Sequence, residues 1–224
     1  MLITIPRVLS RAEVADIAGV LAAAPFVDGK LTAGFAAERV KNNLELERDS
    51  ELRAQLAKLV MGRLYSNETF KAAALPYRAS TPIFARYVPG MFYGDHVDDP
   101  VMGTFGQRYR SDVSLTVFLN APASYDGGEL VVRTPFGDQK VKLPAGDVVV
   151  YPSSSIHHVA EVTRGERLVM ITWLQSMVRD PGRRELLFEL SRARETLLRN
   201  APQAEETKQV DRSYVNLLRM WSEV

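Results

Sequence analysis

The pattern of apolar and polar residues changes twice along the chain. Between residues 82 and 175, short runs rich in valine, isoleucine and aromatic residues are separated by turns that contain Gly, Pro or Asp. Runs of this length are typical of strands, and about eight of them follow one another with a turn roughly every ten residues. This spacing is typical of a sandwich or jelly roll rather than of β-α-β units. The predicted strands cover residues 83–88, 92–97, 114–119, 129–134, 141–143, 148–151, 156–162 and 167–174.

Helical periodicity marks the regions on either side. Ser10 and Glu13 form a capping box that opens a helix ending before Pro25, and Ser50 is expected to cap a second helix that runs to about residue 65. After Pro181, leucines recur at helical spacing, and a polar link at 200–208 leads to a last helix near 213–221. We therefore predict an α+β protein with three segments. They are an N-terminal helical or mixed segment (1–77) that packs on the core, a β-rich domain (78–178) and a C-terminal helical extension (179–224).

Composition narrows the function classes. The 224 residues include 28 Lys and Arg against 27 Asp and Glu, so the formal charge is +1 and gives no global electrostatic reason to bind nucleic acid or an anionic membrane. The absence of cysteine excludes disulfides, thiolate zinc sites and cysteine nucleophiles. The longest apolar stretch, at 168–174, is far shorter than the roughly 18 residues that span a bilayer. The first residues lack a secretory pattern, and we expect a cytoplasmic protein.

The candidate chemistry lies with the histidines. The sequence has three, His96, His157 and His158, all near predicted strand ends. His96 and Asp98 are two residues apart, so on an extended chain their side chains point to the same face. A second imidazole from the later segment would complete the two-histidine, one-carboxylate triad of non-haem Fe(II) oxygenases. The alternative is a surface histidine beside an acidic turn. Arg167 lies ten residues after His157, at the start of the next predicted strand. Its planar guanidinium could bind a dicarboxylate there.

Longer motifs identify a family. The motifs are Arg86-Tyr87-x-x-Gly90-x-x-Tyr93-x-x-His96-x-Asp98, Tyr125-Asp126-Gly127-Gly128-Glu129-Leu130, Pro144-Ala145-Gly146-Asp147, Tyr151-Pro152-Ser153-Ser154-Ser155-x-His157 and Arg164-Gly165-x-Arg167. Together they resemble the Fe(II)/2-oxoglutarate dioxygenases of the prolyl 4-hydroxylase superfamily. More narrowly, they resemble the bacterial PKHD-type hydroxylases of the PiuC/YbiX group. The resemblance covers essentially the whole chain. It implies a double-stranded β-helix (jelly-roll) core with extra helices at both ends.

The resemblance also implies a set of site residues. It assigns His96, Asp98 and His157 to the catalytic iron, and Arg167, with Tyr87, to the distal carboxylate of 2-oxoglutarate. Ascorbate is the implied reductant. The family's Ser-Ser-x-His spacing favours His157 over His158, and adjacent strand residues face opposite ways, so His158 is expected on the other face. Tyr93 and Trp173 are candidates for lining the pocket, and the loop 99–110 is a candidate lid.

The implied reaction is hydroxylation of an unactivated C–H bond, with succinate and CO2 as the other products. The substrate is expected to be a small molecule, such as one related to siderophores and iron uptake, or a peptidyl residue. Two alternatives stay open at this point. One is a cupin-like metal-binding module or isomerase that does not use oxygen. The other is a non-catalytic interaction protein built around the helical tail.

The C-terminal helices carry an apolar stripe. It consists of Leu186, Leu190, Leu197 and Leu198, followed by Tyr214, Leu218 and Trp221. Such a stripe must be covered in a stable protein. It either packs on the β domain or pairs two subunits as a homodimer.

Overall fold

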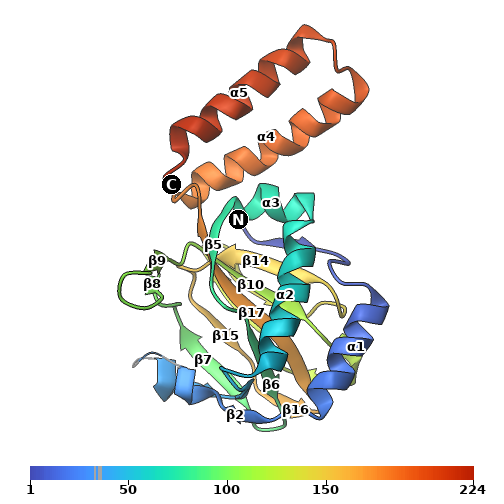
Figure 1. Cartoon of the computed structure of the whole chain (residues 1–224), viewed down its shortest axis with the longest axis vertical. Coiled ribbons are helices and arrows are strands. Elements are labelled where there is room, and N and C mark those ends of the chain that lie inside the picture. Colours follow the sequence, from blue (N-terminus) through green and yellow to red (C-terminus); the bar gives the residue numbers. More distant parts are fainter. Residues whose placement is uncertain (33, 35–36) are drawn as a thin grey trace.

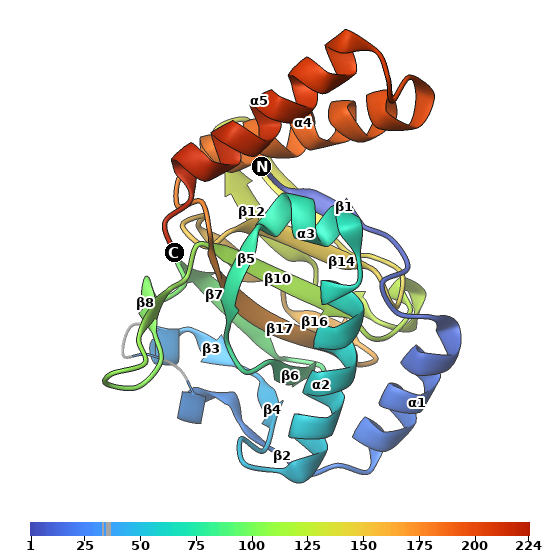
Figure 2. The same cartoon turned by 45° about the horizontal axis from the view of Figure 1, so that its top comes forward.

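The computed structural model describes residues 1–32, 34 and 37–224. Its centre is a pair of antiparallel sheets (Figures 1 and 2). The strands of the larger sheet are, in spatial order, β1 (Ile3–Ile5), β14 (Val148–Pro152), β10 (Val113–Phe118), β17 (Arg167–Ser176), β6 (Ile83–Tyr87), β4 (Leu44–Leu46) and β2 (Phe26–Asp28), with β5 (Pro76–Ala79) also paired to β17. The strands of the smaller sheet are β13 (Gly137–Val141), β12 (Leu130–Thr134), β15 (His157–Val159), β7 (Phe92–His96) and β3 (Lys41–Asn42).

Shorter elements complete the chain. Two further strand pairs join β8 (Val101–Met102) to β9 (Tyr109–Arg110) and β11 (Asp126–Gly127) to β16 (Val162–Arg164). The α-helices are α1 (Arg11–Ala22), α2 (Glu51–Tyr65), α3 (Glu68–Ala74), α4 (Pro181–Asn200) and α5 (Glu205–Trp221), and short 3-10 turns lie at Gly29–Thr32, Ala37–Arg39 and Pro122–Ser124. The arrangement confirms the predicted α+β class and its jelly-roll core with helices at both ends. Among the described residues, no helix combines the length and the apolar character needed to cross a membrane.

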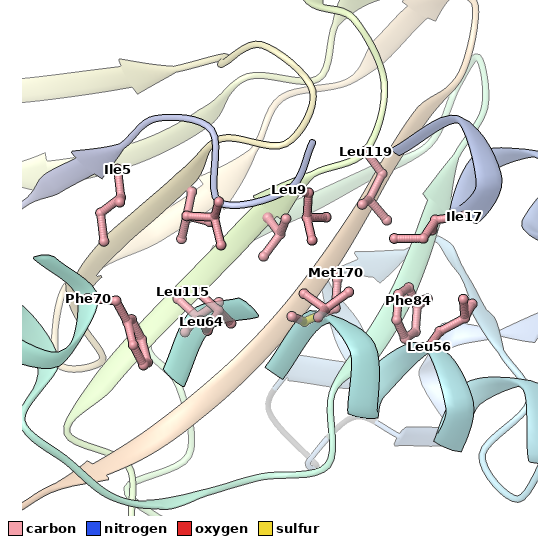
Figure 3. Close-up of a cluster of buried hydrophobic side chains, with 14 of the residues drawn as sticks. Ile5, Leu9, Ile17, Leu56, Leu64, Phe70, Phe84, Leu115, Leu119 and Met170 are labelled. Carbon is pink, nitrogen blue, oxygen red and sulfur yellow. The ribbon is translucent and has the colours of Figure 1, made fainter. Parts of the chain in front are cut away.

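One hydrophobic core lies between the larger sheet and the helices of the N-terminal half. Figure 3 shows Leu56 and Leu64 of α2 and Phe70 of α3 packed against side chains from the sheet, among them Leu115 and Met170. The capping box at the start of α1 is formed as predicted: Glu13 N donates to Ser10 Oγ and Ser10 N donates to Glu13 Oε2. Burial of these apolar faces fixes α1, α2 and α3 on the outer side of the larger sheet.

A second core fills the space between the two sheets. Its buried members come from the inner faces of both sheets and from the β11–β16 pair, and they are Ala85, Tyr87, Phe118, Leu130, Val132, Val141, Val149, Tyr151, Val159, Val162 and Val169. Because successive strand residues face opposite sides, Leu168 and Met170 face the helices while Arg167 and Val169 face inward. Polar residues on the inward face of the larger sheet, such as Arg167 of β17, therefore point into the space between the two sheets.

The C-terminal helices form a hairpin that projects from the β core (Figures 1 and 2). Tyr214, Leu218 and Trp221 of α5 pack in one cluster with buried Leu187 of α4 and Val178. Buried Arg184 anchors the hairpin, because its Nη1 donates to the carbonyl oxygen of Val178 at 2.8 Å. Part of the predicted stripe is thus covered within the chain. Leu186 and Leu198 are exposed, and pairing of two subunits through these helices stays a prediction.

Four predicted boundaries were wrong. The strand expected at 141–143 is β13, which runs from Gly137 to Val141. The single strand expected at 156–162 is two strands, β15 and β16, because the chain leaves the smaller sheet and pairs with β11 instead. The last helix begins at Glu205 rather than near Ser213, and two glutamates in its first turn suit the helix dipole there. The expected loop 99–110 holds the short β8–β9 pair. The mixed region before residue 47 contributes β2, β3 and β4, whose two or three residues are too few to show a period.

Candidate active site

Two neighbouring strands of the smaller sheet bring three potential ligands together. His96 ends β7 and lies directly opposite His157, the first residue of β15, and Asp98 follows two residues after His96. One ligand atom from each of the three side chains lies within 4.8 Å of the other two. Asp98 Oδ1 is 3.9 Å from His96 Nε2 and 3.7 Å from His157 Nε2. These two nitrogens and one oxygen converge as a mononuclear metal site requires.

Backbone carbonyls orient both imidazole rings. The Nδ1 atom of His96 is 2.8 Å from the carbonyl oxygen of Gly94, and that of His157 is 3.0 Å from the carbonyl oxygen of Ser155. A hydrogen bond from Nδ1–H to a carbonyl leaves the lone pair on Nε2, which is the atom that faces Asp98. Burial and, to a smaller extent, the nearby His157 lower the pKa of His96 to about 4. The ring is therefore neutral at neutral pH, the state in which it can bind a metal.

The carboxylate of Asp98 is oriented from the larger sheet. The hydroxyl of Ser114, a buried inward residue of β10, donates to Asp98 Oδ2. Ser114 Oγ also lies 2.8 Å from Ser153 Oγ. One hydroxyl has one proton, so the Ser153 hydroxyl donates to Ser114 in this chain. These hydrogen bonds fix Oδ2 of Asp98, so that Oδ1 is the oxygen that faces the two imidazoles.

Aromatic rings cover the histidines. The ring of Tyr93 stacks on His96 with centroids 3.7 Å apart and an angle of 12° between planes. Tyr151, which burial keeps protonated by raising its pKa, meets His157 edge to face with centroids 5.1 Å apart. These contacts restrict both rings and shield the site from water.

His158 faces the other way. Its Nδ1 lies 2.9 Å from Asp95 Oδ1, and Arg133 donates to the second oxygen of the same carboxylate. Asp95 and Arg133 are both about half exposed, so this is a surface network. The structure thus brings His157 to the cluster and leaves His158 outside it, as the alternation of strand side chains requires.

A buried cation closes the deep end of the interior. Arg167 is 1% exposed, and it lies opposite Tyr87 in the β6–β17 ladder. The Cζ atom of its guanidinium is 4.9 Å from the centroid of the Tyr87 ring. Within the described chain, neither Nε nor Nη1 of Arg167 has a hydrogen-bond partner, and neither has the hydroxyl of Tyr87 or Tyr125. Burial raises the pKa of Tyr87, whereas the Arg167 charge lowers it. Unpaired buried donors around a cation fit a carboxylate ligand.

A pair of glycines lies beside the Arg167 side chain, and the second of them makes room for it. Gly127 and Gly128 have φ angles of 70° and 65°, which favour glycine. A Cβ atom at Gly128 would lie 3.0 Å from both Arg167 Cδ and Tyr125 Cε2. The Asp126-Gly127-Gly128 pattern by itself predicts only a hairpin turn. In the structure, Gly128 also lies against the side chain of Arg167.

A cavity of about 760 Å³ joins these parts. Arg167 and Tyr87 line its deep end, the His96–Asp98–His157 cluster lines its wall, and the β8–β9 pair lines its rim. Tyr93 and Trp173 line it too, so both pocket candidates from the sequence lie at the cavity. This volume lies within the range of about 300–1,000 Å³ typical of small-molecule sites.

Some residues at the site are missing from the sequence prediction. Ser114 is one, although a polar residue at an inward position of an apolar strand is a usable signal. Asn43 is another: both polar atoms of its buried amide lack partners in the described residues, and it lines the cavity. The sequence marks it only as part of a polar cluster, Lys41-Asn42-Asn43, and its place depends on β3 and β4, which carry no periodic signal.

Replacing Ser114 by alanine is expected to weaken divalent metal binding about 10- to 100-fold, the usual cost of losing an outer hydrogen bond to a metal ligand. Competition with a chromophoric chelator measures this affinity. Ser153→Ala should cost less, because Ser153 reaches Asp98 only through Ser114. Unchanged metal affinity in a folded Ser114→Ala protein would contradict the role given to this hydroxyl.

Comparison with known proteins agrees with this geometry. A model of the 2OG-Fe(II) oxygenase superfamily matches residues 82–175, and a model of the PKHD-type hydroxylase C-terminal domain matches residues 182–223. A PKHD-type hydroxylase from Thioalkalivibrio sulfidiphilus is 56% identical over 225 residues, with 100% of both chains covered.

Two solved structures show the same fold. A prolyl-4-hydroxylase from Pseudomonas putida has a TM-score of 0.55 and 21% identity, and the match covers 78% of this chain and 92% of that one. HygX from Streptomyces hygroscopicus, solved with nickel, 2-oxoglutarate and hygromycin B, has a TM-score of 0.54 and 15% identity, covering 79% of this chain and 84% of that one.

Proposed function

Because the chain belongs to the PKHD-type hydroxylases of the 2OG-Fe(II) oxygenase superfamily, and is therefore a 2-oxoglutarate-dependent dioxygenase, we propose that His96, Asp98 and His157 bind its Fe(II). Arg167 and Tyr87 bind the distal carboxylate of 2-oxoglutarate. The observation that carries this proposal is the convergence of three ligand atoms within 4.8 Å in the wall of a cavity that ends at a buried, unpaired guanidinium. The family and the enzyme class agree with the expectation from the sequence motifs.

The donor set fits the metal. Two neutral imidazoles and one carboxylate suit Fe(II) and leave coordination positions for other ligands. When bound, iron and 2-oxoglutarate supply the oxidative decarboxylation that yields succinate and CO2 and the oxidising power that hydroxylates a C–H bond. Ascorbate is the typical reductant of this family. The protein contributes geometry, through the hydrogen bonds that fix each ligand, and exclusion of water.

The deep end of the cavity supports the assignment of the co-substrate. Arg167 offers Nε and Nη1, and Tyr87 and Tyr125 each offer a hydroxyl, so several donors await one carboxylate. Because Arg167 is almost fully buried, its attraction to a carboxylate is much stronger than in bulk water. The absence of a side chain at Gly128 leaves room for the stem of Arg167. A dicarboxylate held here by one end directs its other end toward the histidines.

The substrate occupies the rest of the cavity in this proposal. It is a small molecule, with a siderophore-related compound as the specific candidate from the sequence resemblance, or a peptidyl side chain. The reactive C–H bond lies beside His96, Asp98 and His157. The β8–β9 pair, whose residues Met102 and Tyr109 line the rim, covers it as a lid.

Anaerobic titration followed by oxygen exposure tests the proposed function. We expect 2-oxoglutarate to produce a visible charge-transfer absorption with the Fe(II)-loaded protein. Oxygen should then yield succinate slowly without substrate and faster with the correct compound in a metabolite or peptide screen. Metal binding without any oxygen-dependent loss of 2-oxoglutarate would instead support the cupin-like alternative.

A further inference from the structure

A second buried cation lines the same cavity. Arg53, in the first turn of α2, is 4% exposed. Its Nε donates to the carbonyl oxygen of Pro82 at 2.7 Å, whereas Nη1 has no hydrogen-bond partner in the described chain. Burial lowers the pKa of this guanidinium, and the charge of Glu45 raises it. A buried donor left unpaired costs free energy, so its presence at a cavity wall indicates a ligand.

Trp173 of β17 offers another unpaired hydrogen-bond donor at the same cavity. Its Nε1 is buried without a partner among the described residues, and its ring lines the cavity. The backbone of Trp173 is held by Ser80, whose N donates to the Trp173 carbonyl at 2.8 Å. Ser80 and Pro82 belong to the short link between β5 and β6. This three-residue link therefore holds both Arg53 and Trp173 at the cavity.

This pair lies away from the co-substrate end. Arg167 and Trp173 belong to the same strand and share its inward face, but they are six residues apart, which is about 20 Å at roughly 3.3 Å per residue. The cavity thus has a buried cation at each end of its β17 wall. A co-substrate bound at Arg167 leaves Arg53 and Trp173 free for a second ligand.

The surrounding charges restrict that ligand. Lys41, Glu45, Arg48, Asp49 and Asp99 also line the cavity, and Lys41 and Glu45 are paired with each other. Apart from that pair, this part of the lining carries two cations, Arg53 and Arg48, and two acidic side chains, Asp49 and Asp99. A dianion such as a phosphate would be repelled by these carboxylates, whereas a single carboxylate satisfies the fork of Arg53 and the indole N–H.

We propose that Arg53 and Trp173 form a substrate subsite that binds a carboxylate group of the molecule to be hydroxylated. The proposal rests on the proposed function, since it takes the Arg167 end as the site of 2-oxoglutarate. It narrows the substrate class to compounds with a free carboxylate. The substrate then lies along β17, with its carboxylate at the outer end and its reacting carbon near the histidines.

A fluorescence titration tests this subsite. The chain has two tryptophans, so Trp221→Phe leaves Trp173 as the only indole reporter. The Fe(II)-loaded protein, saturated with 2-oxoglutarate under anaerobic conditions to block Arg167, is titrated with benzoate, hippurate and N-acetylglycine. Each acid is compared with its neutral primary amide. We expect at least one acid to bind about tenfold or more tightly than its amide, as for a hydrogen bond to a charged group.

Arg53→Gln should remove this preference for the acid while metal and 2-oxoglutarate affinities stay within about twofold. Trp173→Phe keeps Arg53 and should reduce the preference for the acid, which calorimetry can measure in the absence of the indole. No preference in the parent protein, or an equal preference in Arg53→Gln, would overturn the subsite. Failure of the parent protein to bind 2-oxoglutarate would instead overturn the proposed function, so the two failures are distinguishable.

Discussion

Replacing Asp98 or His157 by alanine is expected to abolish both Fe(II) binding and the formation of succinate from 2-oxoglutarate. Each residue supplies one of three ligand atoms, and losing one leaves two. Because the loss of an outer hydrogen bond alone costs up to about 100-fold in metal affinity, the loss of a direct ligand should cost more. Metal content after anaerobic loading and succinate yield measure the two effects separately.

His158→Ala is the matched control for His157→Ala. The two residues are adjacent, but the side chain of His158 pairs with Asp95 on the surface and has no contact with the cluster. We expect this variant to keep its iron and most of its activity. If His158→Ala were inactive and His157→Ala active, the ligand assignment would be wrong.

Asp98→Asn refines the same test. The amide keeps the size of the side chain and removes the charge, so it separates the need for a ligand oxygen from the need for an anion. An Asn side chain still has an oxygen that can accept from Ser114. We expect greatly weakened iron binding with an unchanged fold, because the negative charge is what balances Fe(II). Full metal content in this variant would show that charge is not required.

The metal cluster was accessible from sequence because its parts follow local rules. His96 and Asp98 share a face through their spacing of two, and the same alternation separates His157 from His158. The long strand β17 shows a clear apolar run, so the inward direction of Arg167 follows from its place in that strand. The convergence of two segments about 60 residues apart needed the family resemblance, since alternation alone does not pair distant strands.

The outer part of the site was hidden for physical reasons. Lys41 and Glu45 lie on strands of two or three residues, and Asn43 lies between these strands. The pairing of such short strands is decided by tertiary contacts rather than by a sequence pattern. Arg53 did leave a signal. It shares a helical stripe with Ala57, Val60 and Leu64, all of them buried, so a charged residue stands where the period demands an apolar one.

Replacing Arg167 by methionine is expected to raise the dissociation constant of 2-oxoglutarate about 100-fold or more while Fe(II) stays bound. Methionine keeps much of the buried volume and removes the charge. Loss of one partner from a buried ion pair costs about 3–5 kcal/mol, which corresponds to more than a hundredfold in affinity. Titration of the Fe(II) charge-transfer absorption with 2-oxoglutarate measures this constant directly.

Arg164→Met provides the matched control, because Arg164 is an exposed arginine at the end of β16 that pairs with Asp126. It should leave the 2-oxoglutarate affinity unchanged. Thermal unfolding separates binding from folding. The apo form of Arg167→Met should be at least as stable as the parent, because an unpaired buried guanidinium has been removed. 2-Oxoglutarate should then stabilise the Fe(II)-loaded parent but not the variant, and equal stabilisation of both would exclude Arg167 from the co-substrate site.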